Sequence, residues 1–341
     1  MTSTILQAGT RPRAIRMSPA VRRELALVPV IIAALIVGTI LSPTFLTANN
    51  LLNNVLVNSS VLGIVVVAES VILISGYFDL SLESIVGLAP MVAVWLVLPS
   101  SLGGSGLGIP SWLAIVACFA VSAIIGAING LLVTKLKLNA FIVTLAMLTL
   151  LRGVTTGISG GQTLSRLPAE FLFLGSARPF GISIQIWIFV VVVIVVAAFM
   201  QNHPIGRKVY ALGGNQAAAA SAGIKTTKLT IAVFVFGALL SALAGLMLTG
   251  RIASVTSDQG NGLIFTVFAA AVIGGISLNG GQGTIFGAFC GVLLLGIIQN
   301  ILTLSRVPSY WIAAIYGLVI LCALIFNYLA GARPRRNTQR A

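Results

Sequence analysis

The sequence has few charged residues, and acidic residues are especially rare. Its 341 residues include 20 Lys and Arg and only 6 Asp and Glu, so that 8% are charged, whereas a soluble domain carries about 25%. Hydrophobic residues make up 58% of the chain, and 36 glycines add to them. So few charges cannot cover a water-soluble globule, so we expect a protein embedded in a bilayer. The long, continuous apolar runs exclude an outer-membrane β-barrel, in which short stretches alternate.

The sequence also lacks the residues of common catalytic and metal-binding motifs. Histidine occurs once, as His203, with no acid or serine close to it in sequence, which argues against a multi-histidine metal site or a catalytic triad. The dipeptide Gly-Lys is absent, so the phosphate-binding loop G-x-x-x-x-G-K-[ST] is excluded. The three cysteines, Cys118, Cys290 and Cys322, lie in apolar runs without metal-ligand spacing. We therefore predict no cofactor, no metal site and no enzymatic activity in this chain.

The apolar residues form about ten segments that are long enough, or nearly so, to cross a hydrocarbon core ~30 Å thick. The predicted spans are 26–42, 51–75, 82–99, 112–134, 140–158, 183–200, 229–250, 262–276, 284–304 and 310–329. The eighth is too short to count alone as a full crossing. The sequence predicts an all-α, polytopic helical bundle of the inner membrane with about ten transmembrane segments.

The basic residues predict how this bundle is oriented. When the spans alternate, fifteen of the 20 Lys and Arg fall on one side. The five on the other side are Arg152, Arg166, Arg178, Arg251 and Arg306. Because basic residues concentrate in cytoplasmic loops, both termini are predicted to be cytoplasmic. This accounts for the net charge of +14 without a nucleic-acid partner, and lipid headgroups are the expected partner of the basic N-terminal segment.

Three regions follow from this arrangement. Residues 1–24 form a basic cytoplasmic arm, residues 25–330 form the transmembrane domain, and residues 331–341 form a basic cytoplasmic tail. A long cytoplasmic loop lies near 201–228.

The six acidic residues are few enough to consider one by one. Glu24 and Glu170 are expected in solvent at the ends of spans. Asp258 shares a loop with Arg251 and can pair with it. Glu69 lies inside the apolar run 61–75, where a charge costs about 2.5–3.5 kcal/mol unless it faces a partner or water. It either lines a pore or makes a hydrogen-bonded contact between helices.

Two segments interrupt the apolar runs. The first, 75–84, contains Gly76, which can end a helix, and Asp79 and Ser81, either of which can cap the next one. It is either a tight turn or a re-entrant break at membrane depth, whose freed backbone groups must face protein or a cavity. The second, 274–283, contains five glycines, which favour bending or close backbone approach.

The loop between the sixth and seventh predicted spans is expected to contain a short helix. Asn215 is a good N-cap, the alanines at 217–220 favour a helix, and Gly223 suits the position after its end. So short a helix is marginal in water, so we expect it to dock on another protein. It lacks the bulky apolar face of a helix that lies on a membrane.

Four short stretches, taken together and in their order along the chain, carry a resemblance to a known family. They are Asp79-Leu80-Ser81, then AFIVTL at 140–145 with LRG at 151–153, then YALGGN at 210–215 with the alanine run up to Ile224, and the glycine-rich 274–283. With the spans around them, from about 43 to 329, they resemble the permease subunits of ribose-type ABC importers. Branched-chain amino acid permeases are more distant relatives.

This resemblance implies a dimeric membrane pore, with two cytoplasmic ATPase domains and an external solute-binding protein as partners. The loop helix would be the coupling helix that contacts the ATPase. Its implied residues are Gly213, Gly214, Asn215, Gln216, Ala217, Ala218, Ala219, Ala220, Ser221 and Gly223. Many relatives have an acidic residue where this chain has Gln216. At the first break, Tyr77, Phe78 and Glu83 make this chain bulkier and more charged than the usual pattern.

The expected function is import of a monosaccharide or related polyol into the cytoplasm. The predicted translocation-path residues are Glu69, Asp79 and Ser81, with Asn58 and Asn129 as weaker candidates. One alternative is a secondary transporter, in which Glu69 or Asp79 carries a proton. Another is a membrane-embedded enzyme, against which the scattered acids argue.

Overall fold

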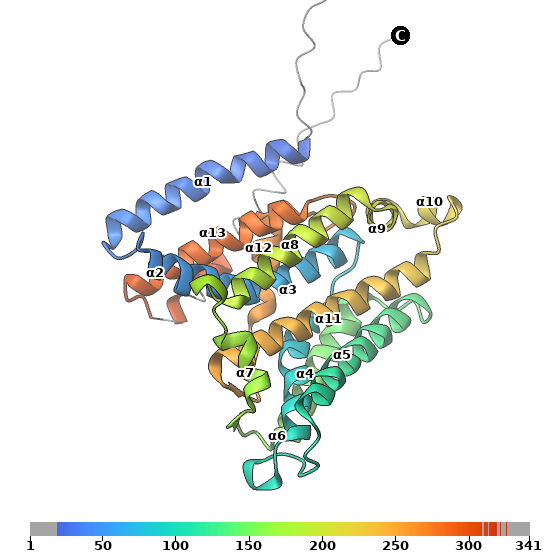
Figure 1. Ribbon diagram of the computed structural model, residues 1–341. Coiled ribbons are helices and arrows are strands. Elements are labelled where there is room, and N and C mark those ends of the chain that lie inside the picture. Colours follow the sequence, from blue (N-terminus) through green and yellow to red (C-terminus); the bar gives the residue numbers. More distant parts are fainter. Residues whose placement is uncertain (1–18, 309, 313, 319–320, 322–324, 326–341) are drawn as a thin grey trace, which may run out of the picture.

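The computed structural model describes residues 19–308, 310–312, 314–318, 321 and 325, and this part of the chain is almost entirely helical (Figure 1). The helices of the first half are α1 (Pro19–Leu41), α2 (Ala48–Asn50), the π-helix η1 (Leu51–Leu56), α3 (Val57–Ile74), α4 (Leu82–Val97), the 3₁₀ turn η2 (Ser100–Leu102), α5 (Ser111–Thr134) and α6 (Ala140–Ser159). Those of the second half are α7 (Ala169–Ser176), the turn η3 (Pro179–Gly181), α8 (Ile184–Asn202), α9 (Pro204–Gly214), α10 (Gln216–Ser221), α11 (Thr226–Ile252), α12 (Leu263–Ile273) and α13 (Ile285–Leu304).

Nine of the ten predicted spans coincide with apolar helices. Six helical segments are long and apolar enough to cross a membrane: Ala48–Ile74, Ser111–Thr134, Ala140–Ser159, Ile184–Asn202, Thr226–Ile252 and Ile285–Leu304. Three predicted spans correspond to shorter apolar helices: Leu27–Leu41, Leu82–Val97 and Leu263–Ile273. Of the tenth span, 310–329, the structure describes 310–312, 314–318, 321 and 325, and these residues are helical. The tail and most of the basic arm lie outside the described residues. The chain is thus an all-α, polytopic membrane protein.

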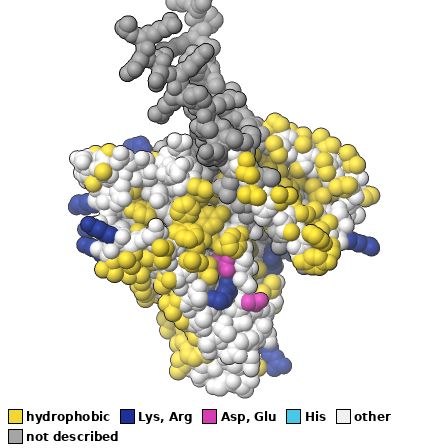
Figure 2. All heavy atoms as spheres, turned by 180° about the vertical axis from the view of Figure 1, so that it is seen from behind, with side chains coloured by type: hydrophobic (Ala, Val, Ile, Leu, Met, Phe, Trp, Pro, Cys, Tyr) yellow, Lys and Arg dark blue, Asp and Glu magenta, His cyan; other side chains and the backbone are white. Residues whose placement is uncertain are grey.

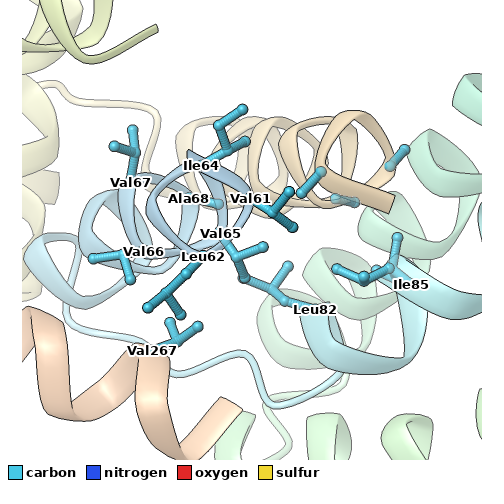
Figure 3. Packing of buried hydrophobic residues seen from close by; sticks show 14 of the residues in the cluster. Val61, Leu62, Ile64, Val65, Val66, Val67, Ala68, Leu82, Ile85 and Val267 are labelled. Atoms are coloured by element: carbon cyan, nitrogen blue, oxygen red, sulfur yellow. The ribbon is translucent and has the colours of Figure 1, made fainter. Parts of the chain in front are cut away.

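Helix α3 occupies the centre of the bundle, where α8, α11, α12 and α13 pack around it. All its residues except Asn58 are buried, as expected for a helix that is apolar on every side. Figure 3 shows Leu62 and Val65 of α3 lying against Leu82 of α4 and Val267 of α12. We call these four side chains the apolar layer. On the face seen in Figure 2, hydrophobic side chains predominate and Lys and Arg are found mainly at the edges.

The bundle has two ends, which we define by the segment that contains α9 and α10. The end of α3 meets this segment, because a Cβ on Gly213 would collide with the backbone of Ile74. Helix α11 begins at Thr226, just after α10. We call this the loop end. The start of α3 and the last turn of α11 lie at the opposite, far end, together with the strand β2 (Ser254–Val255), which pairs antiparallel with β1 (Leu164–Ser165).

Helices α4 and α12 begin inside the bundle. The segment before α12 passes inward from the far end, so that Gln259 is buried and its Nε2 donates to the Val86 carbonyl at 2.9 Å. Helix α12 has 11 residues, about 17 Å at 1.5 Å per residue. The prediction that the eighth segment is too short to count alone as a full crossing is therefore confirmed, and the segment that leads into it packs inside the bundle.

Candidate functional site

Four of the five predicted path residues lie together in the centre of the molecule. Asp79 Oδ1 accepts hydrogen bonds from the Ser81 hydroxyl at 2.5 Å and from the Ser81 amide at 2.9 Å. Ser81 Oγ in turn accepts from Asn129 Nδ2 of α5 at 2.8 Å. The Asp79 amide points to Glu69 Oε1 of α3 at 3.4 Å. We call Glu69, Asp79, Ser81 and Asn129 the buried polar cluster.

None of these four side chains is exposed. Glu69 Oε2, Asp79 Oδ2 and Asn129 Oδ1 have no hydrogen-bond partner in the structure, which is unusual for buried polar atoms. In this conformation Glu69 accepts from the backbone of the break between α3 and α4, so neither of the two roles expected for it is tested. A role in the path would require the bundle to open around the cluster.

The first break differs from expectation in its capping. Gly76 ends α3 with a positive φ of 87°, as predicted. Ser81 is the residue before α4, but its side chain makes no capping hydrogen bond to that helix. Asp79 accepts from Ser81 rather than from an amide of α4. The capping prediction is wrong because these two side chains bond to each other and to Asn129 instead.

Glu83 has a role that the sequence alone did not reveal. Its Oε1 pairs with Arg152 Nη2 of α6 at 3.1 Å, and its Oε2 accepts from the Ile264 amide in the first turn of α12 at 3.1 Å. Arg152 Nη1 also donates to the Gln259 carbonyl at 2.8 Å. A carboxylate is favourable at a helix N-terminus. This group therefore joins α4, α6 and α12 with the segment before it.

Asn58 lies apart from the buried polar cluster, at the far end. Its Oδ1 accepts from Arg251 Nη1 of α11 at 2.7 Å. Both residues line a cavity of about 520 Å³, which we call the far-end cleft. Asp258 lines it too, but the ion pair expected between Asp258 and Arg251 is wrong: the described residues contain one salt bridge, and it joins Arg152 to Glu83. Arg251 bonds to the amide of Asn58 instead.

The predicted loop helix is present as α10. Asn215 Oδ1 accepts from the Ala218 amide at 2.9 Å, so Asn215 is the N-cap as predicted. Gly223 follows the helix with a positive φ of 81°. The expected range needs one correction, because Gly213 and Gly214 belong to the end of α9. The reason is that His203 Nδ1 accepts from the Ile205 amide and starts a separate helix at Pro204.

Helix α10 projects from the edge of the molecule (Figure 1). Most of its implied contact residues are exposed, namely Gly214, Asn215, Gln216, Ala217, Ala218, Ala220, Ser221 and Gly223. Ala219 is the exception, with 5% of its surface exposed. One face of α10 thus packs on the protein and the other is free.

Both breaks meet the α9 end of this loop at one place. The Gly281 amide donates to the Ile74 carbonyl at 2.8 Å. A Cβ on Gly213 would collide with Ile74, and a Cβ on Gly280 would lie 2.7 Å from the Gly213 oxygen and 2.8 Å from Gly76 Cα. We call Gly76, Gly213, Gly280 and Gly281 the glycine junction. It connects the end of α9 to the end of α3 and to the last residues of the second break, 274–283.

Comparison with known proteins identifies the family. Residues 51–324 match the family model described as "Branched-chain amino acid transport system / permease component". No solved structure matches the chain.

Curated relatives cover most of the chain. The ribose import permease protein RbsC of Escherichia coli K12 is 36% identical over 306 residues, which are 89% of this chain and 92% of that protein. The L-arabinose ABC transporter permease protein AraH of Azospirillum brasilense is 33% identical, over 88% of this chain and 84% of its own length. The autoinducer 2 import system permease protein LsrC of Yersinia pseudotuberculosis (serotype O:1b) is 33% identical, over 83% of this chain and 78% of its own length. The chain therefore belongs to the family of ABC-importer permease components that includes the ribose import permeases.

Proposed function

We propose that this chain is the membrane-spanning subunit of an importer that moves a monosaccharide or related polyol into the cytoplasm. Relatives that cover most of its length are named for the import of ribose, arabinose or autoinducer 2. The assembled importer contains a second permease copy and receives its solute from an external binding protein. It lies in the bacterial inner membrane.

The energy for transport comes from a separate ATPase that docks on α10. The observation that carries this proposal is the combination of an exposed, small-residue helix with the glycine junction behind it. A movement imposed on α10 is transmitted by α9 to Gly213, and from there to the ends of α3 and the second break. Backbone atoms in direct contact transmit displacement with little loss, because no flexible side chain lies between them.

The positions of the basic residues support a cytoplasmic loop end. Arg207, Lys208, Lys225 and Lys228 flank α9 and α10 in the sequence. A cavity of about 820 Å³ is lined by Lys137, from the α5–α6 loop, together with Gln216 and Thr227. Lys137 of the α5–α6 loop therefore lies beside the loop that contains α10, at one end of the bundle. This supports a cytoplasmic loop end and an even number of crossings between the α5–α6 loop and the α10 loop.

The solute path runs from the far end to the loop end. Asn58 contributes to it in the far-end cleft, and the buried polar cluster contributes to it when α4 moves away from α3. The hydroxyl, amide and carboxyl groups of the cluster then exchange their mutual hydrogen bonds for bonds to sugar hydroxyls. In the closed conformation they bond to one another.

Reconstitution of the permease with its ATPase in proteoliposomes tests this function. We expect uptake of a radiolabelled monosaccharide that requires ATP, the binding protein and an ATPase able to hydrolyse ATP. Uptake that continues with a hydrolysis-deficient ATPase would rule out the proposal.

A proton-coupled secondary transporter remains the second candidate. The observation that favours it is the pair of buried carboxylates, Glu69 and Asp79, whose outer oxygens have no hydrogen-bond donor. Such groups mark proton pathways in many transporters. That protein would accumulate solute without ATP and would tolerate deletion of α10.

A further inference from the structure

The far-end cleft has the size and lining of a small-molecule site. Its volume of about 520 Å³ falls within the ~300–1,000 Å³ typical of such sites. It lies between the start of α3, the last turn of α11, the start of α12 and the second half of α13. Its polar side chains are Asn58, Ser59, Arg251, Asp258, Asn261, Thr266, Gln299 and Tyr316.

These polar side chains are out of place against lipid. Asn58 and Gln299 are exposed on helices that consist mainly of apolar residues. Polar and ionisable groups at membrane depth are costly unless they face water or one another. The cleft therefore holds water, or a polar solute that replaces it.

Two polar atoms in the cleft have no partner. Ser59 has 1% of its surface exposed, yet its Oγ makes no hydrogen bond in the structure, and the hydroxyl of Tyr316 has none either. A Cβ on Gly296 would collide with Ser59 Oγ, so the glycine leaves room for that hydroxyl. Buried polar atoms are normally satisfied. Hydroxyl groups of a solute are suited to bond to such atoms when the cleft opens around them.

The donor and acceptor groups fit a neutral polyol. The amides of Asn58, Asn261 and Gln299 each present a donor and an acceptor side by side, which matches neighbouring hydroxyls. The single cation and single anion of the lining, Arg251 and Asp258, leave no net charge. Because Arg251 already donates to Asn58, its charge is partly compensated and does not demand an anionic ligand.

The cleft is bordered by the apolar layer. Leu62 lines it and also belongs to the apolar layer, in which it lies against Val267 (Figure 3). Leu82 of the same layer follows Ser81 of the buried polar cluster directly in the chain. The apolar layer thus reaches from the lining of the cleft, at Leu62, to Leu82 beside the cluster.

We propose that the far-end cleft is the site where the permease receives a monosaccharide before translocation, with Asn58, Asn261 and Gln299 bonding to its hydroxyls. This inference rests on the proposed function, because it assumes that the transported solute is a sugar that enters from the far end.

Thiol labelling of the assembled importer tests the site directly. Asn261→Cys is placed in a chain with Cys322→Ala, since Cys118 and Cys290 are buried. The complex is reconstituted with the far end outward and treated with a charged, membrane-impermeant maleimide. The solute is whichever of D-ribose, L-arabinose or D-glucose the complex takes up with ATP, and L-leucine serves as the comparison.

We expect the transported sugar to slow labelling of Asn261→Cys severalfold and leucine to leave it unchanged. Ser165→Cys, exposed in β1 at the same end, should be labelled at one rate with or without sugar. Protection by leucine instead of sugar would overturn the proposal. A cysteine at position 261 that is unreactive under all conditions, because a second permease copy covers it, would also overturn it.

A transport measurement provides the second readout. Gln299→Leu should raise the KM for sugar about threefold to tenfold, as expected for the loss of a hydrogen bond to the solute, with little change in ATP hydrolysis. Gln162→Leu, exposed at the far end outside the cleft, is the matched control. ATP-driven uptake with an unchanged KM in Gln299→Leu and no protection of Asn261→Cys would reject the cleft and leave the proposed function standing. Failure of all three sugars to be taken up with ATP would reject both.

Discussion

The Gly281 amide donates a hydrogen bond of 2.8 Å to the Ile74 carbonyl, and this bond joins the end of α3 to the second glycine-rich break. Gly213 of α9 lies against the same carbonyl. Two interruptions almost two hundred residues apart in the chain thus meet the loop at a single place. The proposed transmission of movement from α10 to the end of α3 depends on this contact.

A methyl group at Gly213 should damage coupling. Gly213→Ala places a Cβ against the Ile74 oxygen and 2.7 Å from the Gly281 amide nitrogen. Overpacking of this kind costs about 1–3 kcal/mol, so the junction must separate. We expect ATP-driven uptake to fall at least about tenfold, the equivalent of 1.4 kcal/mol, while the purified permease stays folded.

The neighbouring glycine provides the control for that variant. Gly214 lies in the same helix, and a Cβ there would meet nothing within 4 Å. Gly214→Ala should therefore transport normally. Equal loss of uptake in both variants would show that α9 is sensitive to alanine in general and that the junction has no special role.

A bulky side chain on the free face of α10 should block docking of the ATPase. Ala218 is exposed, so Ala218→Trp should leave folding intact but abolish sugar-stimulated ATP hydrolysis and co-purification of the ATPase. Ala219 is unsuitable for this test because it is buried. Ala169→Trp, exposed at the far end, should have no effect on either readout. Normal ATP-driven uptake by Ala218→Trp would contradict the docking role.

The ion pair between Glu83 and Arg152 should contribute to stability. Removing one partner of a buried pair typically costs about 3–5 kcal/mol, and Arg152 is 20% exposed, which lowers that cost. We expect Glu83→Gln and Arg152→Gln each to lower the melting temperature of the detergent-purified protein. The double variant should melt well above the value obtained by adding the two losses. Strict additivity would mean that the two side chains do not interact.

Replacement of Glu69 separates ATP-driven transport from proton-coupled transport. Glu69→Gln keeps the size and hydrogen bonding of the side chain but cannot carry a proton. We expect ATP-driven uptake to be retained in Glu69→Gln and reduced in Glu69→Leu, which leaves the Asp79 amide without an acceptor. Uptake measured with and without an imposed pH gradient checks this. Abolished accumulation in Glu69→Gln, together with dependence on the gradient, would favour the secondary transporter.

Local features of this fold could be predicted from the sequence. The apolar runs place nine helices correctly, Asn215 caps α10, and Gly76 ends α3. Each of these depends on a few neighbouring residues, through burial of apolar surface, a capping side chain or a positive φ.

Contacts between distant segments could not be predicted in the same way. Glu83 and Ile264 are 181 residues apart, and nothing near either residue indicates the other. Arg251 has both Asp258 and Asn58 beside the cleft, and only the packing of α3 against α11 decides that it bonds to the amide. Polar residues in apolar surroundings were predicted to line the path, and four of them, Glu69, Asp79, Ser81 and Asn129, do lie together. The sequence did not show that these side chains bond to one another and are buried.

The central claim is that this chain transports only when a separate ATPase drives it. The most direct test measures uphill accumulation of the transported sugar in proteoliposomes that contain the permease alone or the permease with its ATPase. The account predicts accumulation only in the complete assembly, only with ATP, and with no response to an imposed proton gradient. Accumulation by the permease alone, driven by that gradient, would contradict it.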